Sequence, residues 1–248
     1  MTHRPYILLT RPEPQLFEDR AYFEAQGISS LTLPLLRYET LPFSLPEDIQ
    51  EYTLIATSMQ PIRILAEALP PPIKSRITLY IVGEKSKELA LSLGFQAVIA
   101  AAGTGQSLAE RIIQDLSNNK TAHKYLYLRG EDISFDLATA LRSHSLSCIE
   151  TSVYKAHKTS SIPEDIRAHF QNGTIGAITL YSVRSAETLA ALVRVHNLEN
   201  TLKSIHLLSL STNVLECVRM FPWAGTYIPA HPDSAALKTY AVELLNAR

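Results

Sequence analysis

Small hydroxyl side chains and arginines recur where short apolar segments of this chain end. The recurring residues are Thr10, Arg11, Thr57, Ser58, Gly83, Ser86, Arg129, Gly130, Ser182, Ser211 and Thr212. If the apolar segments are parallel strands, these residues lie beyond the strands' carboxyl ends. Helix N-termini present free backbone N–H groups there, and arginine adds bidentate pairing. The set is therefore suited to binding carboxylates or phosphates, although a single Ser or Thr at such a place is more often a helix N-cap.

The elements that must position these residues follow from periodicity. Apolar runs rich in Ile, Val, Leu and Tyr alternate with segments of helical period, which predicts strand–helix alternation and parallel sheets. The predicted strands, four in each of two sheets, are 6–9, 53–56, 79–82, 96–100, 125–128, 175–180, 206–210 and 226–229. Capping patterns predict helix starts at Thr10–Glu13, at Ser107–Glu110 before a helix over 108–116, and at Asp233–Ser234.

One unit is present twice. Tyr6 to Glu39 runs from a strand through a turn and a helix-like stretch to a closing extended segment, and Tyr125 to His157 has the same order. Two further strand ends also recur in the same order: Ser58 is followed by Gly83, and Ser182 is followed by Ser209 at nearly the same spacing. Any α/β chain repeats at a strand-plus-helix period, which leaves a simpler explanation open. The matched Arg, Ser and Tyr residues favour a true repeat.

The repeat predicts the domain limits. If the strand at Tyr6 joins those from Ile175 onward, the first domain is discontinuous and comprises 1–37 plus 156–248. The inserted domain is then 41–151, with extended linkers near 36–41 and 151–157. We therefore expect an α/β fold of two similar parallel-sheet domains, the second inserted into the first, joined by a two-stranded linker about which the domains could hinge around a cleft.

Bulk properties exclude several classes of function. With 23 Lys plus Arg against 24 Asp plus Glu in 248 residues, the charge favours neither nucleic acid nor an anionic membrane. The two cysteines, Cys148 and Cys217, form no ligand spacing for zinc, and so few thiols fit a reducing compartment. The apolar run at Tyr6–Leu9 is too short for a signal peptide. We expect a cytoplasmic, monomeric protein without a bound metal.

Common catalytic motifs are missing from the sequence. It contains no GxSxG, no P-loop and no HExxH, and no nucleophile–base pair stands out. The segment Gly103–Leu108 begins like a dinucleotide fingerprint but has Leu where the third Gly belongs. An enzyme of this composition would therefore work by positioning and electrostatics, with hydroxyl groups assisting.

Several short motifs together resemble the uroporphyrinogen-III synthase family along essentially the whole chain. They are Leu9-Thr10-Arg11-Pro12-Glu13-Pro14, Thr57-Ser58, Val82-Gly83-Glu84-Lys85-Ser86, Tyr127-Leu128-Arg129-Gly130, Val153-Tyr154 and Tyr181-Ser182. The resemblance implies a cofactor-free lyase of heme biosynthesis that closes hydroxymethylbilane, an octacarboxylate, while inverting its last pyrrole ring. Loss of the hydroxyl gives an azafulvene cation, ring D attacks through its substituted carbon, and a spiro intermediate fragments and recloses. Hand-over of substrate from hydroxymethylbilane synthase is also expected.

The resemblance also assigns residue roles. Tyr154 matches the tyrosine proposed in the family to assist departure of the hydroxyl, and Thr212 matches the threonine of a Gly-Pro-x-Thr turn. Here Ser209-Leu210 stands in place of Gly-Pro, and Ser86 replaces the Thr of the related turn. A serine with positive φ would be strained, so we expect that loop to bend differently.

Two other readings compete with the synthase. The first is a cytoplasmic two-domain protein that binds a polycarboxylate without catalysis. The second is a nucleotide-using enzyme, which depends on Gly103-Thr104-Gly105 alone. Production of the isomer would distinguish the synthase from the binding protein. Protection from unfolding by nucleotides, but not by porphyrinogens, would favour the nucleotide-using enzyme.

Overall fold

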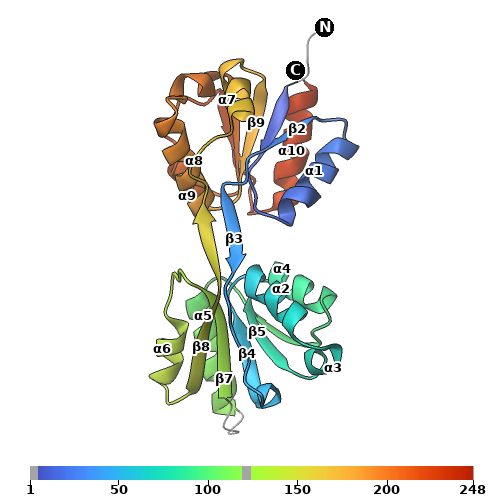
Figure 1. The fold of residues 1–248 in the computed structure, drawn as a ribbon, viewed down its shortest axis with the longest axis vertical. Helices are drawn as coiled ribbons and strands as arrows, with labels where there is room; N and C mark the ends of the chain where they lie inside the picture. The colour runs from blue at the N-terminus through green and yellow to red at the C-terminus, as the bar shows by residue number, and fades with distance from the viewer. Residues whose placement is uncertain (1–4, 119–123, 248) are drawn as a thin grey trace. The chain divides into compact units, whose positions relative to one another are not determined.

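The computed structural model describes residues 5–118 and 124–247. The chain folds as two compact units (Figure 1). Unit 1 comprises Met1–Arg37 and His157–Arg248, and unit 2 comprises Tyr38–Ala156. Residues 1–4 and 248, which the predicted discontinuous domain includes, lie outside the described residues.

Unit 1 contains a five-stranded sheet with the order β11-β10-β9-β1-β2, in which every neighbouring pair is parallel. Its strands are β1 (Tyr6–Leu9), β2 (Ser30–Thr32), β9 (Ile175–Leu180), β10 (His206–Ser209) and β11 (Gly225–Tyr227). Its helices are α1 (Gln15–Ala25), α7 (Glu164–Gln171), α8 (Val183–Val195), η2 (Glu199–Ser204), α9 (Thr212–Glu216) and α10 (Ser234–Asn246).

Unit 2 contains a six-stranded sheet with the order β3-β8-β7-β4-β5-β6. Its strands are β3 (Leu36–Thr40), β4 (Tyr52–Ala56), β5 (Thr78–Val82), β6 (Ala97–Ala101), β7 (Lys124–Gly130) and β8 (Ser147–Lys158). Its helices are η1 (Ile49–Glu51), α2 (Met59–Ala68), α3 (Pro71–Lys74), α4 (Glu84–Ser92), α5 (Gly105–Asn118) and α6 (Leu137–Arg142).

Each sheet is buried on both faces, which explains the continuous apolar runs of its strands. In β1, Ile7 and Leu9 join one core cluster with residues of α1 and α10, while Leu8 joins the cluster on the other face. In β7, Tyr125 and Tyr127 pack with α5 and α6, whereas Leu126 packs on the opposite face. Both units are therefore helix–sheet–helix layers around two apolar cores.

The two sheets share one strand order. The sequence repeat matches β9, β10 and β1 with β4, β5 and β7. Matching β11 with β6 and β2 with β8 as well gives the same arrangement in both units. The α/β class with parallel sheets is therefore confirmed. The expected division into four and four strands is wrong, because the short edge strand β2 and the extended segments β3 and β8 also join the sheets.

The segments that pass between the units lie side by side. β3 and β8 are neighbours at one edge of the sheet of unit 2, and their arrows in Figure 1 run in opposite directions. The N–H of Leu41 donates to the carbonyl of Val153 at 2.9 Å, and that of Thr159 donates to Leu35 at 3.0 Å. Extended, β-branched and aromatic residues at these positions thus form strands and not loops.

Two of the three predicted helix starts differ in the structure. Asp233 caps α10 as expected and accepts from the N–H groups of Ala235 and Ala236. The expected capping box at Ser107 is absent, because α5 begins at Gly105 and the hydroxyl of Thr104 accepts from the N–H of Ser107. Helix α1 begins only at Gln15, since the hydroxyl of Thr10 is buried and donates to the carbonyl of Thr179 at 2.5 Å.

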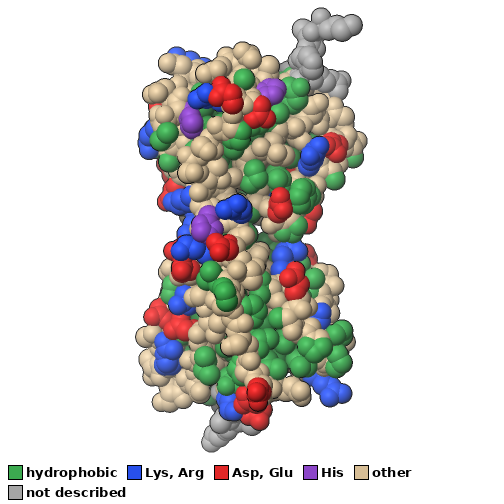
Figure 2. Space-filling model, viewed as in Figure 1, with side chains coloured by type: hydrophobic (Ala, Val, Ile, Leu, Met, Phe, Trp, Pro, Cys, Tyr) green, Lys and Arg blue, Asp and Glu red, His purple; other side chains and the backbone are tan. Residues whose placement is uncertain are grey.

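Charged side chains of both signs are interspersed over the described residues of the face drawn in Figure 2. An anionic ligand on this face would therefore depend on local groups and not on a broad basic surface. No helix within 5–118 and 124–247 is both long enough and apolar enough to cross a membrane.

Candidate functional site

Ligands of open parallel sheets bind beyond the carboxyl ends of strands, at the point where the strand order reverses. In unit 2 this switch point lies between β4 and β7, and in unit 1 it lies between β9 and β1. Thr57 and Ser58 follow β4 directly, and Gly130 ends β7. The topology therefore brings these three predicted residues to the switch point of unit 2.

A pocket of about 320 Å³ occupies this place in unit 2. Four predicted site residues line it, namely Thr57, Ser58, Gly130 and Tyr154. Nine further residues complete the lining: Val82, Gly103, Thr104, Gly105, Tyr127, Asp132, Ile133, Ser134 and Phe135. Apart from its tyrosines, the one ionisable lining residue is Asp132, so the pocket walls combine hydroxyls, backbone, apolar side chains and one carboxylate.

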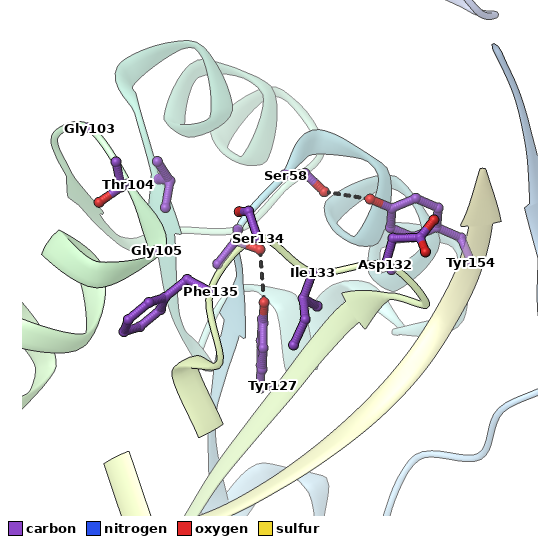
Figure 3. A pocket seen from close by; sticks show the side chains of 13 residues that line it. Ser58, Gly103, Thr104, Gly105, Tyr127, Asp132, Ile133, Ser134, Phe135 and Tyr154 are labelled. Carbon is purple, nitrogen blue, oxygen red and sulfur yellow. Dashed lines mark hydrogen bonds between the residues drawn. The ribbon is translucent and has the colours of Figure 1, made fainter. Parts of the chain in front are cut away.

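Tyr154 is fixed from several sides. Its hydroxyl and that of Ser58 are 3.2 Å apart and point toward one another in Figure 3. Tyr38 contacts the ring edge-on, with ring centroids 5.4 Å apart. Gly130 lies opposite Tyr154 in the β7–β8 register, and a Cβ at that glycine would come within 2.8 Å of Tyr154 Cζ. The tyrosine ring therefore occupies space that only a glycine leaves open.

Ser58 differs from its repeat counterpart in how it uses its hydroxyl. Both residues hold the N-cap position of a helix, Ser58 for α2 and Ser182 for α8. The Ser182 hydroxyl accepts from the N–H of Ser185 at 3.1 Å, which is ordinary capping. Ser58 makes no side-chain cap bond and directs its hydroxyl to Tyr154. The polar group of Ser58 thus belongs to the pocket, while that of Ser182 stabilises its helix.

Tyr127 provides a second hydroxyl pair that sequence reasoning missed. Its hydroxyl lies 3.0 Å from that of Thr57, and its side chain is almost completely buried. Burial raises the pKa of Tyr127, so its hydroxyl remains protonated in neutral solution. Strand register carried the missing signal, because Tyr127 pairs with Ile55, two residues before Thr57 on the same face of the sheet.

The loop before α5 lines the far side of the pocket in Figure 3. Gly103 has a φ of +89°, which a residue with a side chain rarely adopts, and Gly105 begins the helix. The first N–H groups of a helix have no intrahelical partner and carry partial positive charge. The incomplete dinucleotide fingerprint is therefore a turn that opens a helix beside the hydroxyl pairs.

The other predicted residues of unit 2 lie outside this pocket. Gly83 has a φ of +83°, and its N–H donates to the carbonyl of Ala101, while Ser86 is buried in the first turn of α4. Arg129 donates through Nε to Glu150 at 2.8 Å and through a terminal nitrogen to the Gly130 carbonyl. Arg129 is therefore bound to its own strand neighbours.

In unit 1, the predicted residues lie at the ends of β1, β9 and β10. Arg11 contacts Asp19, and its guanidinium lies 4.6 Å from the ring centroid of Tyr181. Ser211 holds the N-cap position of α9, and Thr212 is its first residue. Ser209 is completely buried, and its hydroxyl donates to the Ser211 carbonyl at 3.0 Å.

The loop with the unusual Ser209-Leu210 pair avoids the strain that a positive φ would bring. Among the described residues, the non-glycine positions with positive φ are Ser145 and Asn197. Ser209 is the last residue of β10 and keeps an ordinary backbone conformation. The loop at Ser209 therefore has no glycine-like turn.

Comparisons with known proteins agree with the family resemblance of the sequence motifs. Residues 18–238 match the family model for uroporphyrinogen-III synthase HemD, whereas a search of curated proteins returns no match. The uroporphyrinogen-III synthetase structure of Helicobacter pylori 26695 is 18% identical, with 97% of this chain and 99% of that chain covered and a TM-score of 0.61. A mutant uroporphyrinogen III synthase from the extremely thermophilic bacterium Thermus thermophilus is 14% identical, with 98% of this chain and 100% of that chain covered and a TM-score of 0.56.

The two structural likenesses show a shared fold, and the family match spans most of the sequence. The resemblance first seen in short motifs is confirmed by this match. The chain therefore belongs to the uroporphyrinogen-III synthase family.

Proposed function

We propose that this protein is a uroporphyrinogen-III synthase, a lyase that closes hydroxymethylbilane with inversion of ring D and loss of water. The observation that carries the proposal within the family is the Ser58–Tyr154 hydroxyl pair at the switch-point pocket of unit 2. Ser58 can donate to the tyrosine oxygen while the Tyr154 hydroxyl donates to the departing hydroxyl of the substrate. This arrangement supports assisted loss of water, the first step that family membership implies.

The size and chemistry of the pocket suit one end of a linear tetrapyrrole. Its volume of about 320 Å³ is at the lower end of the roughly 300–1,000 Å³ found for small-molecule sites. A substituted pyrrole ring with its reacting carbon fits such a space better than the whole substrate. Asp132 adds a carboxylate to the lining, which would stabilise the azafulvene cation left when the hydroxyl departs.

Carboxylates of the substrate need donors other than cations at this pocket. The start of α5 at Gly105 offers backbone N–H groups and the positive end of a helix dipole. The hydroxyls of Thr57 and Tyr127 add neutral donors. Binding through local dipoles explains how a protein with a formal charge of −1 would hold a polyanion.

Finer points of the function are proposals as well. We infer contacts to substrate from Thr10, Arg11, Gly83, Ser86, Arg129, Gly130, Ser182, Ser211 and Thr212 because the family motifs place them at strand ends. A cytoplasmic location, a monomeric state and hand-over from hydroxymethylbilane synthase fit the role of such an enzyme.

The deciding experiment is a coupled assay in which hydroxymethylbilane is generated freshly and the oxidised products are separated as type I and type III isomers. Spontaneous closure gives type I, so we expect the protein to add type III. Tyr154→Phe should lower the rate of type III formation about 100- to 10,000-fold, the range for loss of one general acid. Tyr52→Phe is the matched control, since Tyr52 begins β4 and does not line the pocket.

The outcomes separate the competing readings. Type I alone from folded protein would refute the synthase and, with tight binding of uroporphyrin, favour a polycarboxylate-binding protein. Type III formation with an unchanged Tyr154→Phe variant would remove this tyrosine from the mechanism. Loss of activity in Tyr127→Phe alone would assign the proton transfer to the other hydroxyl pair.

A further inference from the structure

A compact charge cluster lies in unit 1, apart from the pocket described above. Asp19 on α1 is at its centre. The terminal nitrogen of Arg11 and the ammonium of Lys238 on α10 each lie 3.4 Å from the same oxygen, Asp19 Oδ1. The two cationic nitrogens are therefore held no farther apart than twice that distance. Three elements of unit 1 converge to make this arrangement.

The cluster has more positive charge than its own carboxylate neutralises. The Asp19 side chain is 1% exposed, whereas Arg11 and Lys238 are 19% and 18% exposed. Charge-assisted hydrogen bonds usually measure about 2.7–2.9 Å, so both 3.4 Å contacts are long. Two partly buried cations thus share one oxygen at a distance that leaves each able to bind a further anion.

The second carboxylate oxygen makes the cluster unusual for a structural ion pair. Asp19 Oδ2 is buried and has no hydrogen-bond partner among the described residues. Burial raises the pKa of Asp19 in spite of the two cations beside it. Buried ion pairs with incomplete hydrogen bonding seldom stabilise a fold, because desolvation offsets their attraction. A role in stability alone therefore explains this cluster poorly.

Aromatic rings hold both cations in place. The guanidinium of Arg11 lies 4.6 Å from the centroid of Tyr181, and the ammonium of Lys238 lies 4.7 Å from that of Tyr22. Cation–π contacts of this length attract the cation without neutralising its charge. The rings fix the positions of the two groups and leave their charge available.

The position of the cluster in the sheet supports a ligand site. Arg11 comes two residues after the end of β1, and Tyr181 follows β9 directly. These neighbouring strands flank the switch point of unit 1, where the strand order reverses. Unit 2 has its pocket at the matching place, between β4 and β7.

We propose that Arg11 and Lys238 form a two-cation site for a carboxylate group of the tetrapyrrole substrate. Asp19 is the positioning residue, because its Oδ1 contacts both cations. The inference rests on the proposed function, and it adds Lys238 and Asp19 to the residues that family motifs supply. Arg11 would bind one carboxylate oxygen and Lys238 the other, while Asp19 stays bonded to both donors.

The first test replaces Lys238 by methionine, which keeps the length and apolar stem of the side chain. We expect the KM for hydroxymethylbilane to rise about tenfold, the effect of losing one charge-assisted contact of about 1.4 kcal/mol, with kcat within about twofold of wild type. Lys238→Arg should restore the KM. Lys203→Met, an exposed lysine in η2 of the same unit, is the control with the same change in charge.

The second test measures binding without turnover. Uroporphyrin I, which carries eight carboxylates, is titrated against each variant at several salt concentrations by fluorescence quenching. Lys238→Met should weaken binding about tenfold and flatten its salt dependence, since one ionic contact is lost. Asp19→Asn should weaken binding severalfold in wild type and much less in the Lys238→Met background, because the aspartate acts through the cations.

These measurements separate failure of the site from failure of the enzyme. A wild-type protein that makes type III isomer, with KM and uroporphyrin binding unchanged in Lys238→Met, would overturn the two-cation site. A wild-type protein that makes no type III isomer, but whose uroporphyrin binding depends on Lys238, would refute the synthase and retain the carboxylate site. Equal effects of Lys203→Met and Lys238→Met on KM and uroporphyrin binding would show that only overall charge matters, and would overturn the proposal.

Discussion

Replacing Gly130 by alanine tests directly whether the position of Tyr154 matters. Gly130 is buried at the end of β7 and pairs with Tyr154 on β8. A Cβ at this position would lie 2.8 Å from Tyr154 Cζ and 2.9 Å from its hydroxyl oxygen. Real Cβ atoms do not approach other heavy atoms this closely, so the tyrosine ring must move.

The size of the movement follows from these contacts. Ordinary van der Waals contact begins near 3.4 Å, so the ring must retreat by about 0.6 Å from its 2.8 Å contact. The Ser58–Tyr154 contact of 3.2 Å is already long for a hydrogen bond between hydroxyls, so a shift of this size would disturb it. Since a misplacement of about 1 Å costs on the order of 100-fold in rate, we expect kcat to fall about tenfold. Overpacking should also lower the free energy of unfolding by about 1–3 kcal/mol.

Gly176→Ala is the matched control for steric strain. Gly176 lies in β9 of unit 1, where a Cβ would meet Leu245 at 2.7 Å and Pro5 at 2.8 Å. It should lower the free energy of unfolding by a similar amount and leave kcat per folded molecule unchanged. Type III formation and urea unfolding are measured for both variants. Wild-type kcat in Gly130→Ala, or an equal kcat loss in Gly176→Ala, would refute the reasoning.

Three further predictions concern stability, reactivity and folding. Burial raises the pKa of Asp19, although the neighbouring Arg11 and Lys238 lower it and Glu18 raises it further. The contribution of Asp19 to stability is therefore present below its unfolded pKa of about 4. It is lost as pH rises through the pKa of the folded state. The free energy of unfolding of Asp19→Asn should therefore increase relative to that of wild type as pH rises above about 4. A difference that stays constant with pH in urea titrations would contradict this. Burial raises the pKa of Cys148 to about 11, so a thiol reagent at about pH 8 should modify Cys217 first, and peptide mapping with Cys148 labelled first would disprove it. The fragment 38–156 should unfold cooperatively in thermal circular dichroism, whereas 41–151 lacks the fully buried Val153 and should be much less stable; equal stability would argue against this role for β8.

Much of the fold could be predicted because parallel strands covered on both faces are written as apolar runs. β1 and β9 begin and end where the sequence predicts them, and the repeat explains why both sheets have one strand order. β2 was missed because an edge strand of three residues, two of them polar, has no such run. The helix start at Ser107 was misplaced because Thr104 offers a competing hydroxyl three residues earlier.

Four of the predicted site residues come together where the repeat and the strand ends coincide. Thr57, Ser58, Gly130 and Tyr154 share one pocket because they flank neighbouring strands of a parallel sheet. Gly83 and Ser86 follow β5, one strand farther from the switch point, and the sequence alone does not give that strand order.

The charge cluster also left a trace in the sequence. Asp19 stands between Leu16 and Phe23 at the spacing of the buried face of α1, where an apolar residue is expected. Lys238 shares the face of Ala241 and Leu245 on α10. A charged residue at an apolar position of a helix is a signal for a buried partner, but the identity of that partner depends on which helices cover the same face of the sheet.

The two halves of the repeat have taken different chemistry at matching places. The hydroxyls of Ser58 and Thr57 pair with tyrosine hydroxyls of the unit 2 pocket, whereas Ser182 caps its helix and Tyr181 covers a guanidinium. Arg129, the counterpart of Arg11, is paired with Glu150 at 2.8 Å, closer than Arg11 is to Asp19. With the roles proposed above, unit 2 would use hydroxyl groups for proton transfer while its arginine pairs with Glu150, and unit 1 would use its arginine for binding. Exchanging one group alone would then remove one function without creating the other, because each depends on partners from a different helix.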